Sequence, residues 1–261
     1  MTVRGGAPAG LARFARGAGS APGPIADVAA PAPPAAPVER CELCAERLDD
    51  RHGHIADLEQ RAIRCTCRAC YLLFTREEAG GGRYRAIPDR VLHDPAHPLS
   101  RAGWERLQIP VAVAFFLTAT ASPSEAETVT VTEAETVTET VTRAEGGGAR
   151  TTVSAFYPGP AGATECLLDL DAWNRLREEH PLLAEAVPDV EAIVVRCDAG
   201  NRDCYLVPID VCYELVGRLR LQWRGFDGGE QARAGIDEFF DTLRRRARGF
   251  DPASSPAGGP R

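Results

Sequence analysis

Two cysteine pairs close together in the chain constrain its structure more than any other feature. The segment "CELC" contains Cys41 and Cys44, and "CTCRAC" contains Cys67 and Cys70 at the same spacing. Each Cys-x-x-Cys turn directs two thiolates to one point, and two turns supply the closed tetrahedral shell of a structural zinc site. The spacing therefore predicts a small metal-binding module with zinc as the metal.

Iron is the alternative metal for the same four cysteines. A rubredoxin-like site also uses two Cys-x-x-Cys turns, so the alternative function is an iron electron carrier. The second turn lacks the flanking proline and glycine that such iron sites usually show, which favours zinc. Buried cysteines without a metal remain a third interpretation, whereas a thioredoxin-like redox pair would need a strand ahead of Cys41 that the sequence does not indicate.

Three further donor side chains lie near the two turns. His52 and His54 occur in "RHGHI" between the turns, and Cys65 precedes the second turn. Imidazole and thiolate both bind zinc, so these residues are candidate additional ligands. The alternative is that the histidines are exposed or support a hairpin through hydrogen bonds. A spare set of donors would suit a metal-transfer enzyme or chaperone better than a purely structural zinc site.

Composition divides the chain into several segments. Residues 1–38 are rich in Ala, Pro and Gly and predict a disordered arm. Residues 39–90 predict a zinc-ribbon-like module, in which "YLLFT" and "RYRAI" form a second hairpin across "GGG". Residues 91–250 predict a larger domain with a low-complexity insert at 122–149, where Glu, Thr and Val repeat. Residues 251–261 predict a disordered tail.

The larger domain mixes strand and helix patterns. Strands are expected within 109–117, 151–157, 164–168, 191–197 and 203–207. Helices are expected to begin at two capping aspartates, Asp171 and Asp210, and a last helix is expected over 230–248. Because strands and helices do not alternate regularly, the predicted class is α+β, with helices on one face of a sheet.

Charge and hydropathy restrict the partners and the location. The net charge is −7, and residues 41–106 hold 11 basic and 11 acidic side chains, which leaves no net field for phosphate. No nucleic-acid partner is therefore expected, and a nucleic-acid-binding regulator is kept only as an alternative. The chain shows no secretory signal and no apolar run of the ~20 residues that a membrane helix needs. A cytoplasmic location and no membrane span are expected.

Several longer segments together resemble a known family. They are "CELC", "RHGHIADLEQRAIRCTCRACYLLF", "GGGRYRAIPDR", "AFYPGPAGATE", "CYLVPIDVCYELVGRLRLQWRGFDGG" and "IDEFFDTLR". The chain resembles an uncharacterised actinobacterial family of unknown function, encoded beside high-affinity NiFe-hydrogenase genes. The resemblance implies a protein partner, either a hydrogenase or its maturation machinery. It implies no catalytic residues, so the expected function is that of a non-enzymatic metal-binding accessory protein.

Overall fold

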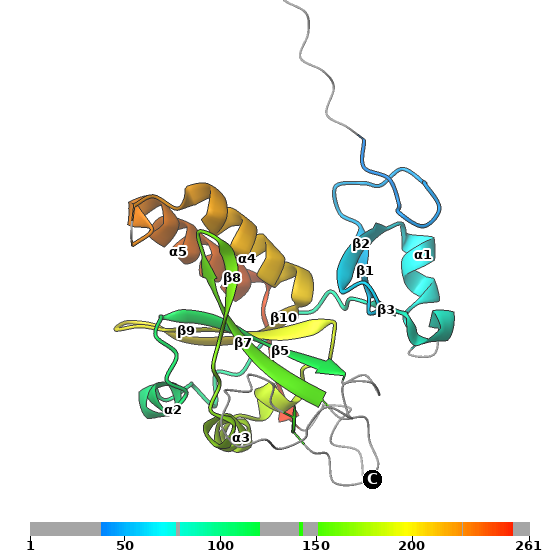
Figure 1. The fold of residues 1–261 in the computed structure, drawn as a ribbon. Helices are drawn as coiled ribbons and strands as arrows, with labels where there is room; N and C mark the ends of the chain where they lie inside the picture. Colours follow the sequence, from blue (N-terminus) through cyan, green and yellow to red (C-terminus); the bar gives the residue numbers. More distant parts are fainter. Residues whose placement is uncertain (1–37, 77–78, 121–140, 143–150, 226, 253–261) are drawn as a thin grey trace, which may run out of the picture. The chain divides into compact units, whose positions relative to one another are not determined.

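The computed structural model describes residues 38–76, 79–120, 141–142, 151–225 and 227–252 (Figure 1). From Val38 onward the described residues form one compact unit that contains two sheets. The predicted arm lies outside the described residues except for Val38. The same holds for most of the predicted insert and tail.

The cysteine-rich segment forms a small antiparallel sheet followed by a helix. Its strands are β1 (Gly53–Asp57), β2 (Ala62–Thr66) and β3 (Tyr84–Ala86), in the spatial order β2-β1-β3. Helix α1 (Arg68–Leu73) follows β2 directly, and a short 3₁₀ turn, η1 (Ala79–Gly82), precedes β3. The predicted small sheet with four clustered cysteines is confirmed.

The second hairpin predicted for this module is wrong. Most of "YLLFT" belongs to α1, and β3 pairs with β1 and not with the segment before the glycines. The Tyr71 N–H donates to the Cys67 carbonyl at 2.9 Å, which closes the first helical turn. The Tyr71 ring lies so close to Gly53 that a Cβ there would come within 2.7 Å of it. Tyr71 thus packs the helix against β1, whereas Leu72 and Leu73 on the same helix are exposed.

The larger sheet is almost entirely antiparallel. Its strands are β4 (Leu92–His93), β5 (Val113–Thr120), β6 (Val141–Thr142), β7 (Thr151–Gly159), β8 (Gly162–Cys166), β9 (Glu191–Cys197), β10 (Arg202–Pro208) and β11 (Arg248–Gly249). The order is β11-β4-β10-β9-β5-β7-β6, with β8 paired to β7, and only β11 runs parallel to its neighbour β4. Strand β9 matches its predicted range of 191–197.

Helices cover both faces of this sheet (Figure 1). Helices α2 (Arg101–Arg106), α3 (Leu170–Glu179) and the 3₁₀ turn η3 (Pro181–Ala184) pack on one face, whereas α4 (Ile209–Gln222) and α5 (Gly229–Arg246) pack on the other. The α+β class is confirmed, but the expectation of helices on one face is wrong. The reason is visible in β5, where Phe115 and Phe116 point to opposite faces and both are buried.

Two predicted helix starts also differ from the structure. Asp169, and not Asp171, caps α3, because its Oδ1 accepts the Ala172 N–H at 2.9 Å. Helix α4 begins at Ile209 without a side-chain cap, so Asp210 lies inside its first turn. The Asp210 carboxylate is thereby left to interact with the small module. No helix in the described residues is both long and apolar enough to cross a membrane.

Candidate metal centre

The four cysteines predicted as ligands converge in the structure. The Sγ atoms of Cys41, Cys44, Cys67 and Cys70 all lie within 4.8 Å of one another. The Cys44 and Cys67 Sγ atoms are 3.7 Å apart. A tetrahedron with Zn–S bonds of about 2.3 Å has edges of about 3.8 Å, so this separation fits two ligands of one ion. The cluster could hold a metal ion such as zinc.

Backbone hydrogen bonds shape the first cysteine turn. The Cys41 N–H donates to the Glu46 carbonyl, and the Ala45 N–H donates back to the Cys41 carbonyl, both at 2.8 Å. Ala45 adopts a positive φ of 63°, which reverses the chain directly after Cys44. The turn is therefore held in shape by its own backbone.

Glu42 fastens this turn to β2. Its N–H donates to the Cys65 carbonyl at 3.0 Å, and its Oε1 accepts the Cys65 N–H at 2.8 Å. Its other carboxylate oxygen accepts from Arg64 at 3.0 Å. Strand β2 leads directly into the second cysteine turn, so Glu42 sets the distance between the two pairs of thiols.

The second pair lies at the start of α1. Cys67 occupies the N-cap position and Cys70 the first turn of the helix, so both side chains face the first cysteine turn. Cys41 and Cys70 are buried, whereas Cys44 is exposed and Cys67 half-buried. One side of the cluster thus faces the protein interior and the other faces solvent.

Thiols supply most of the apolar contacts here. The buried cluster consists of Cys41, Leu48 and Cys70, with Cys65 and Cys67 packed against it. The other buried apolar residues of the module, such as Ile55 and Ile87, lie in or near the small sheet, so Leu48 is the one non-cysteine member of the cluster around the thiols. A metal ion bound by the four thiolates would supply folding free energy here.

The protein environment separates the pKa values of the cluster's thiols. Burial raises the pKa of Cys41, but backbone N–H groups of Cys67 and of its own turn donate to it, and together they lower the pKa to about 6. Burial, reinforced by hydrogen bonds from the neighbouring thiols, raises the pKa of Cys70. Cys41 is therefore a thiolate at neutral pH, the form that binds metal.

The three additional candidate donors also come together, but apart from the four cysteines. Potential ligand atoms of His52, His54 and Cys65 lie within 4.8 Å of one another. His54 Nδ1 lies 2.7 Å from Oδ2 of Asp210, a contact that the sequence analysis missed. Their separation of 156 positions in the sequence hides this pair from any local pattern. Its only sequence signal is an aspartate in the first turn of a predicted helix.

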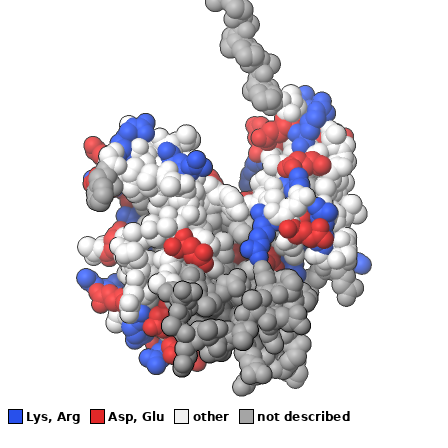
Figure 2. Space-filling model, viewed as in Figure 1, with Lys and Arg blue, Asp and Glu red and all other residues white. Residues whose placement is uncertain are grey.

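Charges on the small module alternate in sign. Figure 2 shows arginine and carboxylate side chains interspersed over its visible face. Exposed carboxylates of the module pair with its arginines, as Glu42 does with Arg64 and Glu59 does with Arg83. The described surface of the module therefore presents no continuous basic stripe on this side.

The comparisons with known proteins identify a family and no activity. The model of a family of unknown function, DUF5947, matches residues 40–144 and 145–247, so the chain belongs to this family. No curated protein and no solved structure matches the chain. The expected membership in a family of unknown function is confirmed.

Proposed function

We propose that this member of the DUF5947 family is a zinc-binding accessory protein without catalytic activity of its own. The observation that carries the proposal is the convergence of four cysteine Sγ atoms from two Cys-x-x-Cys turns, with Cys44 and Cys67 Sγ 3.7 Å apart. A closed four-thiolate shell leaves no coordination position for a substrate. Its role is to hold the first cysteine turn and α1 in the shape that a protein partner recognises.

Zinc is favoured over iron for this shell. Both metals accept four thiolates in a tetrahedron, so the geometry alone suits either. The second cysteine turn opens a helix and has no glycine or proline beside its cysteines, unlike the turns usual around rubredoxin-type iron. Purified protein should therefore be colourless, because Zn²⁺ has a filled d shell, whereas ferric thiolate absorbs visible light.

The proposed partner is a NiFe-hydrogenase or its maturation machinery. This part rests on the resemblance of segments such as "CELC" and "RHGHIADLEQRAIRCTCRACYLLF" to proteins encoded beside hydrogenase genes. The alternating charges on the module favour a protein partner over nucleic acid. We place the protein in the cytoplasm, where thiols stay reduced and remain available to a metal.

Elemental analysis of protein purified without added metal tests the metal assignment. We expect zinc in the purified chain, and we expect Cys44→Ser or Cys67→Ser to lower the zinc content by one ion per chain. Cys212→Ser is the matched control, because Cys212 is buried in α4 within the large domain. If Cys44→Ser and Cys67→Ser both keep the full zinc content, the ligand assignment is wrong.

A deletion strain tests the accessory role separately. It should transcribe the hydrogenase genes normally but oxidise hydrogen poorly, and wild-type protein should restore the activity. Cys67→Ser should fail to restore it, whereas Cys212→Ser should succeed. Normal hydrogen uptake by the deletion strain would rule out the hydrogenase partner and leave the zinc assignment unaffected.

A further inference from the structure

Strand geometry gathers a second set of metal donors beside the four-cysteine cluster. His52 and His54 flank Gly53 at the start of β1, so their side chains lie on the same face of the strand. His54 is the direct cross-strand partner of Cys65 in β2. The two imidazole rings lie 4.9 Å apart at their centroids. One face of a two-stranded ladder therefore presents two imidazoles and a thiol together.

Hydrogen bonds orient both imidazoles for metal binding. His54 Nδ1 lies 2.7 Å from Asp210 Oδ2, and His52 Nδ1 lies 2.9 Å from the Asp49 carbonyl oxygen. A carbonyl or carboxylate oxygen can only accept, so each Nδ1 carries the proton and donates. Each Nε2 then bears a lone pair, as in metal sites where a carboxylate or carbonyl fixes the tautomer of the ligating histidine.

One of these lone pairs has no partner among the described residues. His52 Nε2 is buried and makes no hydrogen bond, and the His52 side chain is only 11% exposed. A buried acceptor without a donor is costly, so such an atom calls for an explanation. A metal ion bound at Nε2 supplies one.

We propose that His52 Nε2, His54 Nε2 and Cys65 Sγ form a second metal site, separate from the four-cysteine cluster. Two imidazoles and one thiolate form a zinc ligand set, and three protein ligands leave the fourth position open. One ring nitrogen of each histidine and Cys65 Sγ lie within 4.8 Å of one another, and small side-chain rotations would bring the three donors to about the spacing that ligands of one ion need. The proposal goes beyond the accessory function, which requires no open position.

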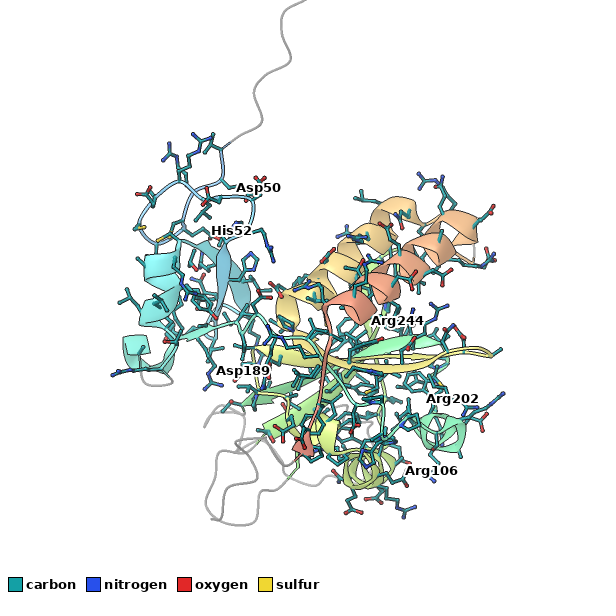
Figure 3. The ribbon with its side chains drawn as sticks, turned by 180° about the vertical axis from the view of Figure 1, so that it is seen from behind. Asp50, His52, Arg106, Asp189, Arg202 and Arg244 are labelled. Atoms are coloured by element: carbon teal, nitrogen blue, oxygen red, sulfur yellow. The ribbon has the colours of Figure 1, made fainter. Side chains whose placement is uncertain are left out.

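A cavity large enough for a small molecule lies beside the two histidines, and Cys65 is not among the residues that line it. This cavity has a volume of about 750 Å³ and is lined in part by His52, His54, Tyr71, Asp210 and Arg246. Figure 3 shows His52 and the preceding Asp50, which also lines the cavity, on the loop that enters β1. The second carboxylate oxygen of Asp210, Oδ1, is buried without a hydrogen-bond partner in the part of the chain that the structure describes, so it can accept from a bound molecule.

These features define the class of ligand. The cavity walls carry both arginines and carboxylates, so they select no single sign of charge. The metal requires a donor atom at its fourth position. We assign this fourth ligand as water or the thiolate of a small molecule. The site is therefore an exchangeable metal site with a small-molecule space in front of it.

Zinc stoichiometry in the full chain tests the site. We expect two zinc ions per chain in the wild type at saturating zinc, and one in His54→Gln. His97→Gln is the matched control, because His97 Nδ1 also contacts a carboxylate, Asp94 Oδ2, at 2.8 Å but belongs to neither donor cluster in the described residues. A wild type that saturates at one zinc, or an unchanged count in His54→Gln, would overturn the proposal.

Cobalt substitution tests the open position. Addition of 2-mercaptoethanol to the wild-type Co²⁺ protein should change its visible spectrum, and His54→Gln should abolish this change. An identical response in both proteins would show that the added thiol acts elsewhere, and no response in the wild type would show that the position is closed. Cys44→Ser affects the four-cysteine cluster alone. If that cluster binds no zinc, Cys44→Ser keeps the wild-type zinc count, and if the second site binds no zinc, His54→Gln keeps it.

Discussion

The large sheet domain and the small module achieve stability by different means. In the large domain, central strands such as β5 and β9 bury apolar side chains on both faces, and two helix layers cover them. Around the cysteines of the small module, the buried apolar side chains are mainly thiols and Leu48. The large domain is stabilised by apolar burial, and the small module has such burial around β1, where Ala56 and Ile87 pack with Val190, but little around its cysteines. If the four thiols bind a metal, as proposed, this end of the module depends on that ligand. Metal donors therefore accumulate where the hydrophobic core is weakest.

Metal removal should affect the two regions most differently. Structural zinc contributes about 10–16 kcal/mol to the folding of zinc-finger peptides, so a chelator should unfold the cysteine turns and α1. We expect the backbone amides of Cys41, Ala45 and Tyr71 to lose protection from hydrogen exchange, because their acceptors lie within these turns. Unchanged protection of these amides in the metal-free protein would contradict the assignment.

The large domain should remain folded under the same treatment. Trp104, Trp173 and Trp223 all belong to it, and the chain contains three tryptophans in total, so their fluorescence reports on this domain alone. We expect the emission spectrum and the denaturant midpoint to change little after chelation.

The opposite test creates a cavity in the hydrophobic core of the large domain. Phe116 is 2% exposed and stacks on Trp173, with ring centroids 4.5 Å apart. Phe116→Ala should lower the free energy of unfolding by about 3–5 kcal/mol, measured by tryptophan fluorescence in denaturant. Zinc content should stay at the wild-type value.

Leu221→Ala is the control for this cavity. Leu221 is 78% exposed on α4, so its truncation should change the free energy of unfolding by less than about 0.5 kcal/mol. If Phe116→Ala released zinc in proportion to its loss of stability, the two regions would form one cooperative unit.

The same contrast explains what the sequence could predict. Apolar strand patterns are local, and they placed β9 at its exact ends and β10 within one residue of each end. The Cys-x-x-Cys spacing is local as well, and it identified the four converging thiols. The strand pattern and each Cys-x-x-Cys turn depend on residues only a few positions apart, where chain geometry fixes the outcome. The two turns lie farther apart, and the tetrahedral ligand set of a metal predicted their meeting.

Apart from the local error of two residues in the cap of α3, the failures share a different cause, since they depended on packing between distant segments. Helix α1 forms where a strand was expected because Tyr71 packs on Gly53. Helices cover both sheet faces because β5 is apolar on both sides. A strand that alternates apolar and polar residues would have one apolar face to cover. The contact of His54 with Asp210 joins the small module to α4 and depends on the assembled tertiary structure.

Asp210→Asn alters the contact between the small module and the large domain. The carboxylate orients His54 through the 2.7 Å hydrogen bond, and loss of such a partner typically lowers metal affinity about 10- to 100-fold. We expect a loss of this size for the more weakly bound zinc, measured by competition with a chromophoric chelator.

The tightly bound zinc should be unaffected by Asp210→Asn. Glu214→Gln is the control, because Glu214 lines the same cavity one helical turn further along α4. Equal affinities in wild type and Asp210→Asn would remove Asp210 from the site.

The smallest expected effect concerns acid stability of the large domain. Asp198 lies in the β9–β10 turn, and burial raises its pKa, but the hydrogen bond from Arg196 and those from the turn's own N–H groups lower it from 3.8 to about 2. Because the pKa in the folded protein is below the ordinary value, the unfolded chain takes up this proton first as the pH falls. The contribution of Asp198 to stability is therefore complete above about pH 4 and is lost between pH 4 and pH 2.

Asp198→Asn should lower stability at neutral pH by about 1 kcal/mol, since water partly screens the pair, and should flatten the decline below pH 4. Tryptophan fluorescence isolates this domain from the zinc-dependent module, which acid disrupts separately by protonating its thiolates. Asp237→Asn removes a more exposed carboxylate from the same Arg196, 2.7 Å away, and should cost less. If the stabilities of Asp198→Asn and wild type declined in parallel between pH 4 and pH 2, protonation of Asp198 would not account for the loss of stability in this range.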